Sequence, residues 1–554
     1  MKKPQLSEMT LNEKIGQLLM FHGNCVDTLD ELLEVVEKYQ PGTFWLDALP
    51  RGGAGSAAGE AFGLDTTSRD GKSYPMDDDK RYAELLNSKA KYPILFADDS
   101  EQNIQDRYIG RTRGVAPFSV GAANNEALTY QLYKGLAAEN RAVGKRWRWA
   151  PVIDLPNRLN AVSMGRTCSD DIDTIVKNAV ATCRAHESEG VVSCVKHFPG
   201  CDPTEICDSH FVPTEIIVSY DEWLSGQGQT FKRVIDAGVM SIMTSHVAFP
   251  DADDEKIGGK YIISTLSKKI TTDILRNKLG FNGVIITDDV QMGGFSAFAP
   301  REELMIRAIN AGNDVLLGVK VRDAEIIHRA VADGRIPISR IDESCQRVLD
   351  MKEKIGLFDD EETPYTPPEE AKRLMTEAAE QISERALTLL YDRNNIIPLT
   401  PEKIKSVAIV YISHRESGLK AMDILKAEFL KRGAAANVYD CIDFDNRDEI
   451  FEHDLILYIG WISQHNPMGL PSFHDRRMQS FFHAFTVSNE RSIGISVGYP
   501  YIHLDAMTGA NTFINAYSCD DRTLTALAKA LYGEIPFVGK SPVDIEPKLR
   551  KIYF

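Results

Sequence analysis

Short apolar runs alternate with amphipathic stretches along residues 1–362. Each run is rich in Val, Ile, Phe or Met, a pattern typical of parallel strands that are buried on both faces. The stretches between them, such as 127–143 and 172–189, carry apolar residues at helical spacing. The pattern predicts strands at 42–46, 93–97, 149–154, 191–197, 239–244, 283–287 and 314–319.

This strand–helix alternation favours a closed barrel over an open sheet, because polar residues cluster just past the ends of the apolar runs. In (β/α)8 barrels that rim carries the chemistry. We therefore expect an α/β protein whose first domain, residues 1–362, is a TIM-like (β/α)8 barrel.

The pattern changes after the barrel. Prolines at 364–368 are followed by a strongly helical run, so we expect a linker and connector helix over 363–395. Beyond it, strand-like runs at 407–411, 455–459 and 493–497 alternate with helical runs at 418–432 and 522–531. Residues 396–554 are therefore predicted to form a smaller α/β sandwich domain.

One long segment shows neither the apolar runs of the predicted strands nor the helical spacing of the stretches between them. Residues 51–74 are rich in Gly, Ala and Ser and read as a loop, which by its length is either functional or disordered. Because it follows the first predicted strand, it would lie at the rim of the barrel and could roof the cleft.

Composition narrows the choice of partner. Hydrophobic residues make up 43% and charged residues 26% of the 554 positions, as in ordinary globular proteins. The net charge of −17 disfavours nucleic acid and anionic membranes, which bind basic surfaces. No apolar window has the length of a membrane span. The expected substrate is neutral, or an anion held by a local basic pocket.

Cysteine usage and the start of the chain indicate the compartment. Lys2 and Lys3 are not followed by the apolar segment of a secretory signal. Nine cysteines without regular spacing are typical of free thiols in a reducing cytoplasm. We expect a cytoplasmic protein.

The strongest chemical candidates follow two predicted strands. Asp208 and His210 lie on the loop after strand 191–197, where a carboxylate and an imidazole two residues apart can form a proton donor. Asp288 ends strand 283–287. An isolated Asp-x-His pair is usually a salt bridge or a loop cap, but with Asp288 it indicates the two halves of one active site.

A metal site is the competing interpretation of the same loop. Cys201, Cys207 and His210 lie close together, with Cys194 nearby. Their spacing is not the C-x2-C hook of structural zinc sites, and no second hook exists. We expect neither a metal nor another cofactor.

Motifs in these regions resemble those of glycoside hydrolase family 3, in its two-domain β-N-acetylglucosaminidase branch. Residues 196–200, Lys-His-Phe-Pro-Gly, are similar to the family's signature, and Asp208-Ser-His210 matches the D-S-H of that branch. Residues 280–292 resemble the nucleophile strand. Further similar segments are 11–18, 244–246, 496–501, 516–518 and 531–543.

The resemblance implies a retaining mechanism, in which a carboxylate forms a covalent glycosyl intermediate between two inversions at the anomeric carbon. It places Asp288 as the nucleophile and His210 as the acid/base, with Asp208 fixing the His210 ring. Asp289 is the competing choice for the nucleophile, but its side chain should point to the other side of the strand end. We rank it as a supporting residue.

The resemblance also implies groups that bind the sugar. These are Lys196 and His197 at a strand end, Asp99 after strand 93–97, and the arginines Arg107 and Arg166. His246 is a further candidate, as a wall residue. The alternative for Asp99, Arg107 and Arg166 is a set of ion pairs that brace the rim, and for Lys196 and His197 a buried pair satisfied by barrel carbonyls.

The sequence departs from the family within the acid/base loop. The family pattern is P-G-H-G-D-T-x-x-D-S-H, whereas residues 199–210 read Pro-Gly-Cys-Asp-Pro-Thr-Glu-Ile-Cys-Asp-Ser-His. The His-Gly pair is replaced and the loop is one residue longer. This difference bears on specificity more than on the reaction.

Together these features predict an exo-β-N-acetylglucosaminidase that trims N-acetylglucosamine from cell-wall fragments or chitooligosaccharides. A β-glucosidase or β-xylosidase is the first alternative. Phosphorolysis is the second, because an imidazole acid leaves the site less negative than a glutamate and so permits phosphate. The third is a carbohydrate-binding relative without turnover. The expected partner is a small carbohydrate, and the oligomeric state is left open.

Overall fold

The first domain is a parallel eight-stranded barrel, which confirms the fold class predicted from the strand–helix alternation. The computed structural model describes residues 2–46, 74–99, 101, 108–109, 112–156, 158, 160, 162–202, 204–413, 416–443, 445–462 and 488–546. Within them the strands run in the order β13-β9-β7-β6-β4-β2-β1-β14, and a parallel bridge from Ile286 to Val315 closes the ring. Their bounds are β1 Leu19–His22, β2 Thr43–Trp45, β4 Leu95–Asp98, β6 Lys145–Arg148, β7 Val192–Phe198, β9 Ser241–Thr244, β13 Val284–Thr287 and β14 Leu316–Val319.

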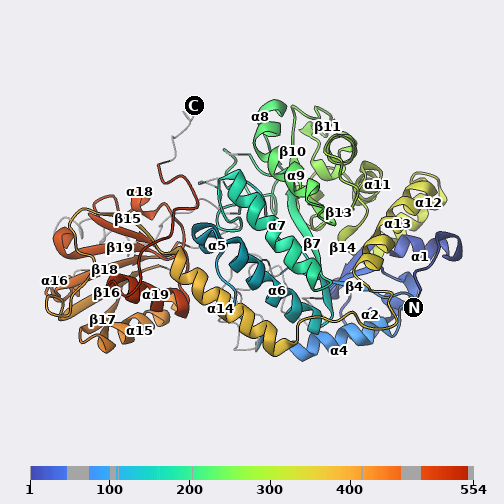
Figure 1. Ribbon diagram of the computed structural model, residues 1–554. Coiled ribbons are helices and arrows are strands. Elements are labelled where there is room, and N and C mark those ends of the chain that lie inside the picture. Colours follow the sequence, from blue (N-terminus) through green and yellow to red (C-terminus); the bar gives the residue numbers. More distant parts are fainter. Residues whose placement is uncertain are drawn as a thin grey trace.

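Helices surround the barrel and bury their apolar faces against it (Figure 1). Several begin at a side chain that accepts a hydrogen bond from a first-turn amide, as Thr28, Asn125 and Asp171 do. The main helices are α2 Leu29–Tyr39, α4 Met76–Asn87, α6 Glu126–Ala142, α7 Ile172–Ser188, α9 Gln227–Asp236, the π-helix Lys269–Lys278, α11 Arg301–Ala311, α12 Val321–Ala332 and α13 Ile338–Lys354.

Two strands differ from the sequence prediction. β6 covers 145–148, and the predicted strand at 149–154 continues from it beside β7, paired there only by an isolated parallel bridge from Val152 to Lys196. The β6 sequence lacks an apolar run because it includes buried charged side chains. One of them, Lys145, forms an ion pair with Asp79, its Nζ lying 2.9 Å from that carboxylate. β1 was not predicted because only Gln17 and Leu18 separate it from the short helix α1 Leu11–Gly16, so no loop signal marks its start.

The second domain is a six-stranded mixed sheet in the order β15-β20-β19-β18-β16-β17. Only the β15–β20 pair is antiparallel. Helices α15 Glu416–Lys431 and α19 Asp521–Leu531 pack on one face, as expected for an α/β sandwich. The strands are β15 Thr388–Asp392, β16 Ser406–Ile412, β17 Ala435–Asp440, β18 Leu455–Gly460, β19 Ser492–Ser496 and β20 Thr512–Asn515.

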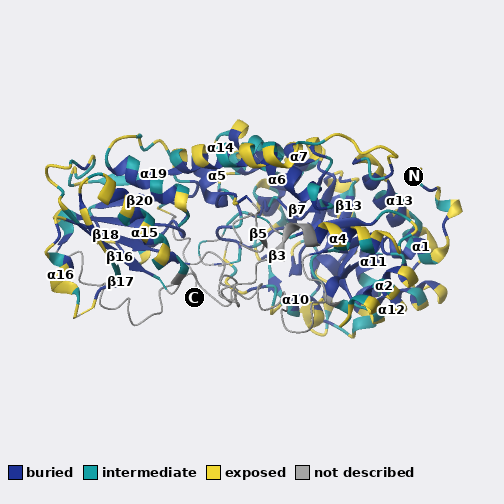
Figure 2. Ribbon diagram, turned by 90° about the horizontal axis from the view of Figure 1, so that it is seen from below, coloured by how far each residue is buried: buried dark blue, intermediate teal, exposed yellow. Residues whose placement is uncertain are grey.

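The other face of this sheet packs against the first domain. Phe118 of α5 (Pro117–Ala123) and Met164 of the loop after β6 share an apolar cluster with Tyr499 and Tyr517. Helix α14 (Pro368–Ala386) joins the domains and runs along both of them (Figures 1 and 2). The loop after β6 therefore has one face toward the barrel rim and one toward the second domain.

Two further findings concern the described residues. No helix among them combines the length and the apolar character needed to cross a lipid bilayer. All nine cysteines are free thiols.

Candidate active site

One pocket collects side chains from the carboxyl ends of β7 and β13 and from the loops that follow β6 and β7. It brings together His210 and Asp288, the predicted acid/base and nucleophile. Parallel barrel strands all end at the same rim, which is why residues far apart in the sequence meet here. The lining residues are Asp154, Asn160, Val162, Ser163, Arg166, His197, Gly200, Cys201, Asp202, Glu205, Cys207, Ser209, His210, Thr214, Ser245, Val247 and Asp288.

Asp208 and His210 form a hydrogen-bonded pair on the loop after β7. The Nδ1 atom of His210 lies 2.6 Å from Asp208 Oδ1, which also accepts from the His210 backbone N–H at 2.9 Å. Because Nδ1 faces a carboxylate it carries a proton, and Nε2 is the nitrogen left for a ligand. Burial lowers the pKa of this imidazole, but the hydrogen bond and charge of Asp208 and the charge of Asp288 outweigh it and raise the pKa.

Asp288 directly follows β13 and is fixed by backbone contacts on both sides. Its N–H donates to Thr244 O at 2.9 Å, and its Oδ1 accepts from the Asp289 N–H at 2.8 Å. Burial raises the pKa of the Asp288 carboxyl, but the imidazoles of His197, His246 and His210 outweigh burial and hold the pKa below its ordinary value. Asp288 is thus an ionised carboxylate at neutral pH.

Asp289 turns away toward β14. Its Oδ1 accepts from the Gln291 N–H at 2.9 Å, in space that a Cβ on Gly318 would occupy. Gly318 has a φ of 76°, a conformation that favours glycine. Burial raises the pKa of Asp289 to about 7. The Asp289 carboxyl is thus less readily ionised than that of Asp288, and it lies on the other side of the strand end.

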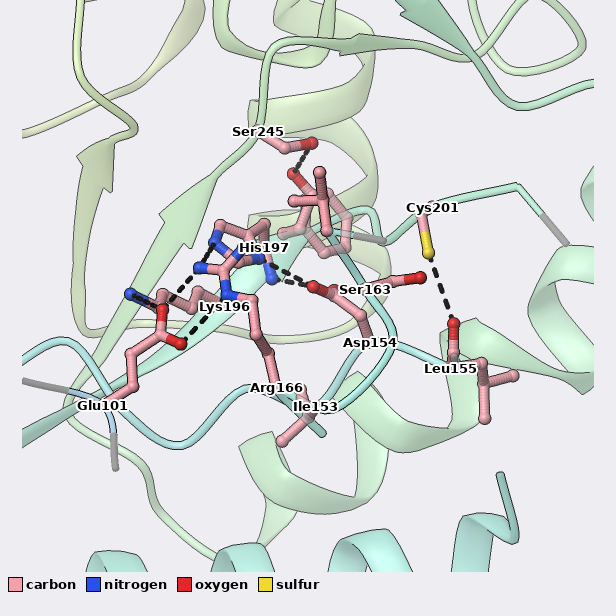
Figure 3. Close-up of polar contacts among 12 residues, drawn as sticks. Glu101, Ile153, Asp154, Leu155, Ser163, Arg166, Lys196, His197, Cys201 and Ser245 are labelled. Carbon is pink, nitrogen blue, oxygen red and sulfur yellow. Dashed lines mark hydrogen bonds and ion pairs between the residues drawn. The ribbon is translucent and has the colours of Figure 1, made fainter. Parts of the chain in front are cut away.

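Lys196 and Arg166 meet around a carboxylate that the sequence analysis did not single out, Glu101 (Figure 3). Lys196 Nζ lies 2.9 Å from Asp99 and 2.6 Å from Glu101. Arg166 forms a two-point ion pair with Glu101, its Nε donating at 2.9 Å. Burial raises the pKa of Glu101, but Arg166 and Lys196 outweigh it and hold the pKa well below its usual value.

His197 is oriented by Asp154, a second residue that sequence reasoning missed. Its Nδ1 lies 2.7 Å from Asp154 Oδ2, and its backbone N–H donates to Asp154 Oδ1 at 2.9 Å. The Nε2 atom lies 3.2 Å from Arg166 Nη2, which is a donor only, so Nε2 accepts. Asp154 ends the segment predicted as strand 149–154, and a polar residue at a strand end was the sequence signal that could have identified it as a rim residue.

His246 supports the nucleophile segment. The ring is fully buried; Nε2 donates to Asp289 O at 3.0 Å and Nδ1 lies 2.9 Å from Thr265 Oγ1. Both nitrogens are therefore engaged by the protein, and His246 is not among the residues that line the pocket. The geometry fits a residue that supports the Asp289 backbone from behind the pocket, not a wall residue or a direct sugar contact.

The acid/base loop rests directly on the segment that follows the nucleophile. The Gly293 N–H donates to His210 O at 2.7 Å, and the Gly294 N–H donates to Ser209 O at 3.1 Å. A Cβ on Gly293 would collide with the Phe211 carbonyl oxygen, and one on Gly294 with the Ser209 carbonyl oxygen. Only glycines allow this close approach.

The altered loop at 201–207 is held by its own carboxylates. Asp202 accepts from the N–H groups of Thr204 and Ile217, each at 2.7 Å. Glu205 accepts from the N–H of Cys207 at 2.7 Å and of Glu215 at 3.2 Å. The longer loop thus keeps His210 on the pocket.

Two predicted features lie outside the described residues: Arg107 and residues 51–73 of the long loop. Within the described residues, no cluster of three or more His, Cys, Asp or Glu side chains could hold a metal ion.

Comparison with known sequences identifies relatives of the chain. Residues 10–351 match the sequence model "Glycosyl hydrolase family 3 N terminal domain". A β-N-acetylglucosaminidase/β-glucosidase of Cellulomonas fimi is 25% identical over 489 residues, covering 83% of this chain and 85% of that protein. A β-hexosaminidase of Methylobacillus flagellatus is 32% identical over 182 residues, which are 33% of this chain and 50% of the relative.

Solved structures share the two-domain architecture. A β-glucoside phosphorylase superposes with a TM-score of 0.82 at 24% identity, covering 98% of this chain and 95% of that one. A glycoside hydrolase family 3 β-N-acetylglucosaminidase from Paenibacillus sp. str. FPU-7 gives a TM-score of 0.77 at 22% identity, covering 97% and 99%. At these identities the likeness establishes the fold.

Proposed function

Because the chain belongs to glycosyl hydrolase family 3, we propose that it is a retaining exo-β-N-acetylglucosaminidase acting on cell-wall fragments or chitooligosaccharides. The observation that carries the proposal is the meeting of Asp288 and His210 on one pocket, with Asp208 bonded behind the His210 ring. The name of the Cellulomonas fimi relative includes this activity beside a β-glucosidase activity, and the β-hexosaminidase name of the Methylobacillus flagellatus relative favours the N-acetylated sugar.

In the first step, the Asp288 carboxylate attacks the anomeric carbon while His210 Nε2–H protonates the leaving oxygen. The bond from the anomeric carbon to that oxygen breaks, and a glycosyl ester forms on Asp288. The carboxylate of Asp208 stabilises the proton on Nδ1, so His210 can lose its other proton and still remain oriented.

In the second step, the neutral His210 accepts a proton from water as the water oxygen attacks the anomeric carbon. The ester bond to Asp288 breaks and the sugar leaves with its original configuration. The raised pKa of His210 favours the protonated ring that the first step needs, and the ring becomes the base of the second step once it has given up that proton.

The cluster around Glu101 holds the groups that would meet the sugar hydroxyls. Lys196 is almost fully buried, with 3% of its side chain exposed, whereas Asp99 is 35% exposed. Neither residue lines the pocket of His210 and Asp288, so Asp99, the more exposed of the two, would accept from a hydroxyl that reaches beyond that lining while Lys196 fixes its position. Arg166 and His197 line the pocket and would donate and accept there.

The test compares p-nitrophenyl N-acetyl-β-glucosaminide with the corresponding glucoside, in buffers with and without phosphate. We expect faster turnover of the N-acetyl substrate, independent of phosphate, with retained configuration by proton NMR. Asp288→Asn should lower kcat on the order of 10⁴-fold or more while the protein stays folded, because no nucleophile replaces the carboxylate.

Three other outcomes have distinct meanings. Turnover of the glucoside alone would contradict the proposed sugar specificity. Formation of a glycosyl phosphate only when phosphate is present would identify a phosphorylase. Silence on both substrates, together with binding of N-acetylglucosamine, would identify a carbohydrate-binding relative.

A further inference from the structure

We propose that Asn160 is a positioning residue for the proton donor, and that the second domain holds the loop on which Asn160 lies. The inference rests on the proposed function, because it assigns Asn160 a role through His210. Asn160 belongs to the loop after β6 and does not carry chemistry itself.

Asn160 bridges the two loops that form the walls of the pocket. Its Nδ2 donates to Glu205 O and to Cys207 O, each at 3.1 Å. Its Oδ1 accepts from the N–H of Val162 at 2.9 Å and of Ser163 at 3.0 Å. One side chain thus ties the loop of Arg166 to the loop of His210.

The hydrogen-bond network fixes the orientation of this amide. Both neighbours of Nδ2 are carbonyl oxygens and both neighbours of Oδ1 are N–H groups, so exchanging the two atoms would break all four bonds. Asn160 is 5% exposed, so a lost partner would not be replaced freely by water. The bridge is therefore specific to an amide.

The bridge ends where the acid/base dyad begins. Cys207, whose carbonyl oxygen Asn160 contacts, directly precedes Asp208. On its far side the dyad is held by Gly293 and Gly294, through His210 O and Ser209 O. The dyad is thus fixed from the nucleophile side and from the Asn160 side, and removing the second support frees it to shift.

The second domain contacts the loop of Asn160 on the side that faces away from the pocket. Arg158 forms an ion pair with Asp505, and its carbonyl oxygen accepts from the Tyr499 hydroxyl at 3.3 Å. Further along, Ser169 donates to Pro542 O at 2.5 Å. Met164 is buried in the apolar cluster shared by the two domains. The pocket wall that carries Asn160 is therefore packed between the barrel and the second domain.

The decisive variant is Asn160→Asp, which keeps the two acceptor bonds to Val162 and Ser163 but loses both donors. We expect kcat/KM for methyl N-acetyl-β-glucosaminide to fall on the order of tenfold to a hundredfold, since misplacing a catalytic group by about 1 Å costs up to about a hundredfold. The 2,4-dinitrophenyl substrate, whose leaving group needs little protonation, should lose much less. The alkaline limb of the pH–rate profile should also shift.

Two controls separate positioning from general damage. Asn489 makes the same kind of bridge in the second domain, donating to Gly509 O at 2.6 Å and accepting from the Asn511 N–H at 2.9 Å. Asn489→Asp should leave the ratio of the two substrates unchanged. In a His210→Ala background, Asn160→Asp should cause no further loss with the methyl glycoside, because the group it positions is gone.

The failures are distinguishable. An equal loss for both substrates, or the same loss in the His210→Ala background, would overturn the positioning role while leaving the proposed function intact. If the wild-type protein turns over neither substrate, the proposed function fails. Hydrogen exchange of amides 205–212 then decides: faster exchange in Asn160→Asp than in Asn489→Asp supports the bridge, and unchanged exchange overturns it.

Discussion

At the scale of single residues, the carboxylate of Asp208 favours the protonated form of the His210 imidazole, the proposed acid/base. Burial would lower the pKa of His210, and the 2.6 Å bond to Asp208 is the first of the contacts that reverse this and raise it. His210 must be protonated to act as the acid, so activity should be lost as pH rises through its raised pKa. The acid limb belongs to Asp288, whose pKa is held below its ordinary value.

Asp208→Asn should therefore move the alkaline limb of kcat/KM to lower pH, because the neutral amide no longer favours the imidazolium. The fall at neutral pH should be on the order of 10²- to 10⁴-fold for a poor leaving group. A pH–rate series with the methyl glycoside measures both effects. An alkaline limb that stays in place would show that His210 is not the group that titrates.

At the scale of elements, a contact between two loops ties the segment of His210, the proposed acid/base, to the segment that follows Asp288, the proposed nucleophile. The N–H groups of Gly293 and Gly294 donate to the acid/base loop, and neither glycine has room for a Cβ. The nucleophile segment after β13 and the acid/base segment after β7 therefore move together. Their spacing does not depend on β7 and β13 alone.

Gly294→Ala should push the Ser209 carbonyl oxygen away and displace His210. We expect kcat/KM to fall on the order of 10²-fold, with a stability loss of about 1–3 kcal/mol from overpacking. Gly460→Ala is the control, because its Cβ would meet only the flexible ends of Ile502 and Met507 in the second domain. Equal activity of the two alanine variants would exclude this contact as the determinant of the spacing.

At the scale of the whole molecule, the two domains share an apolar cluster whose member Met164 directly follows the pocket-lining residue Ser163. Met164 lies in that cluster, fully buried, two residues before Arg166. A cavity at this position would loosen both the domain contact and the wall. The second domain is therefore expected to affect catalysis without contributing a described residue to the pocket lining.

Met164→Ala should lower the free energy of unfolding by about 2–5 kcal/mol and also lower kcat/KM. Met422 offers the comparison, since it is equally buried within the core of the second domain. Met422→Ala should cost similar stability, measured by denaturant unfolding, with normal kcat/KM per folded molecule. A normal kcat/KM in Met164→Ala would contradict the link between the domain contact and the wall.

The sequence by itself determined the fold class and pointed to Asp288 and His210, which line one pocket, and to Asp208, which is bonded to the His210 ring. Apolar runs report buried strands directly, and a polar residue after such a run is carried to the barrel rim wherever its strand ends. The charged strand β6 was not predicted, because the carboxylate that pairs with its Lys145, Asp79, lies in a distant part of the chain. A local pattern does not contain that partner.

Only the tertiary structure decided how these groups are held. Glu101, Asp154 and Asn160 each contact a partner on another part of the chain, and only Asp154, at the end of a predicted strand, had a local signal. The turn of His246 toward Asp289 had no such signal either. Residue types fix which chemistry is possible, but the distances between them come from packing across strands and between domains, which no local stretch of sequence contains.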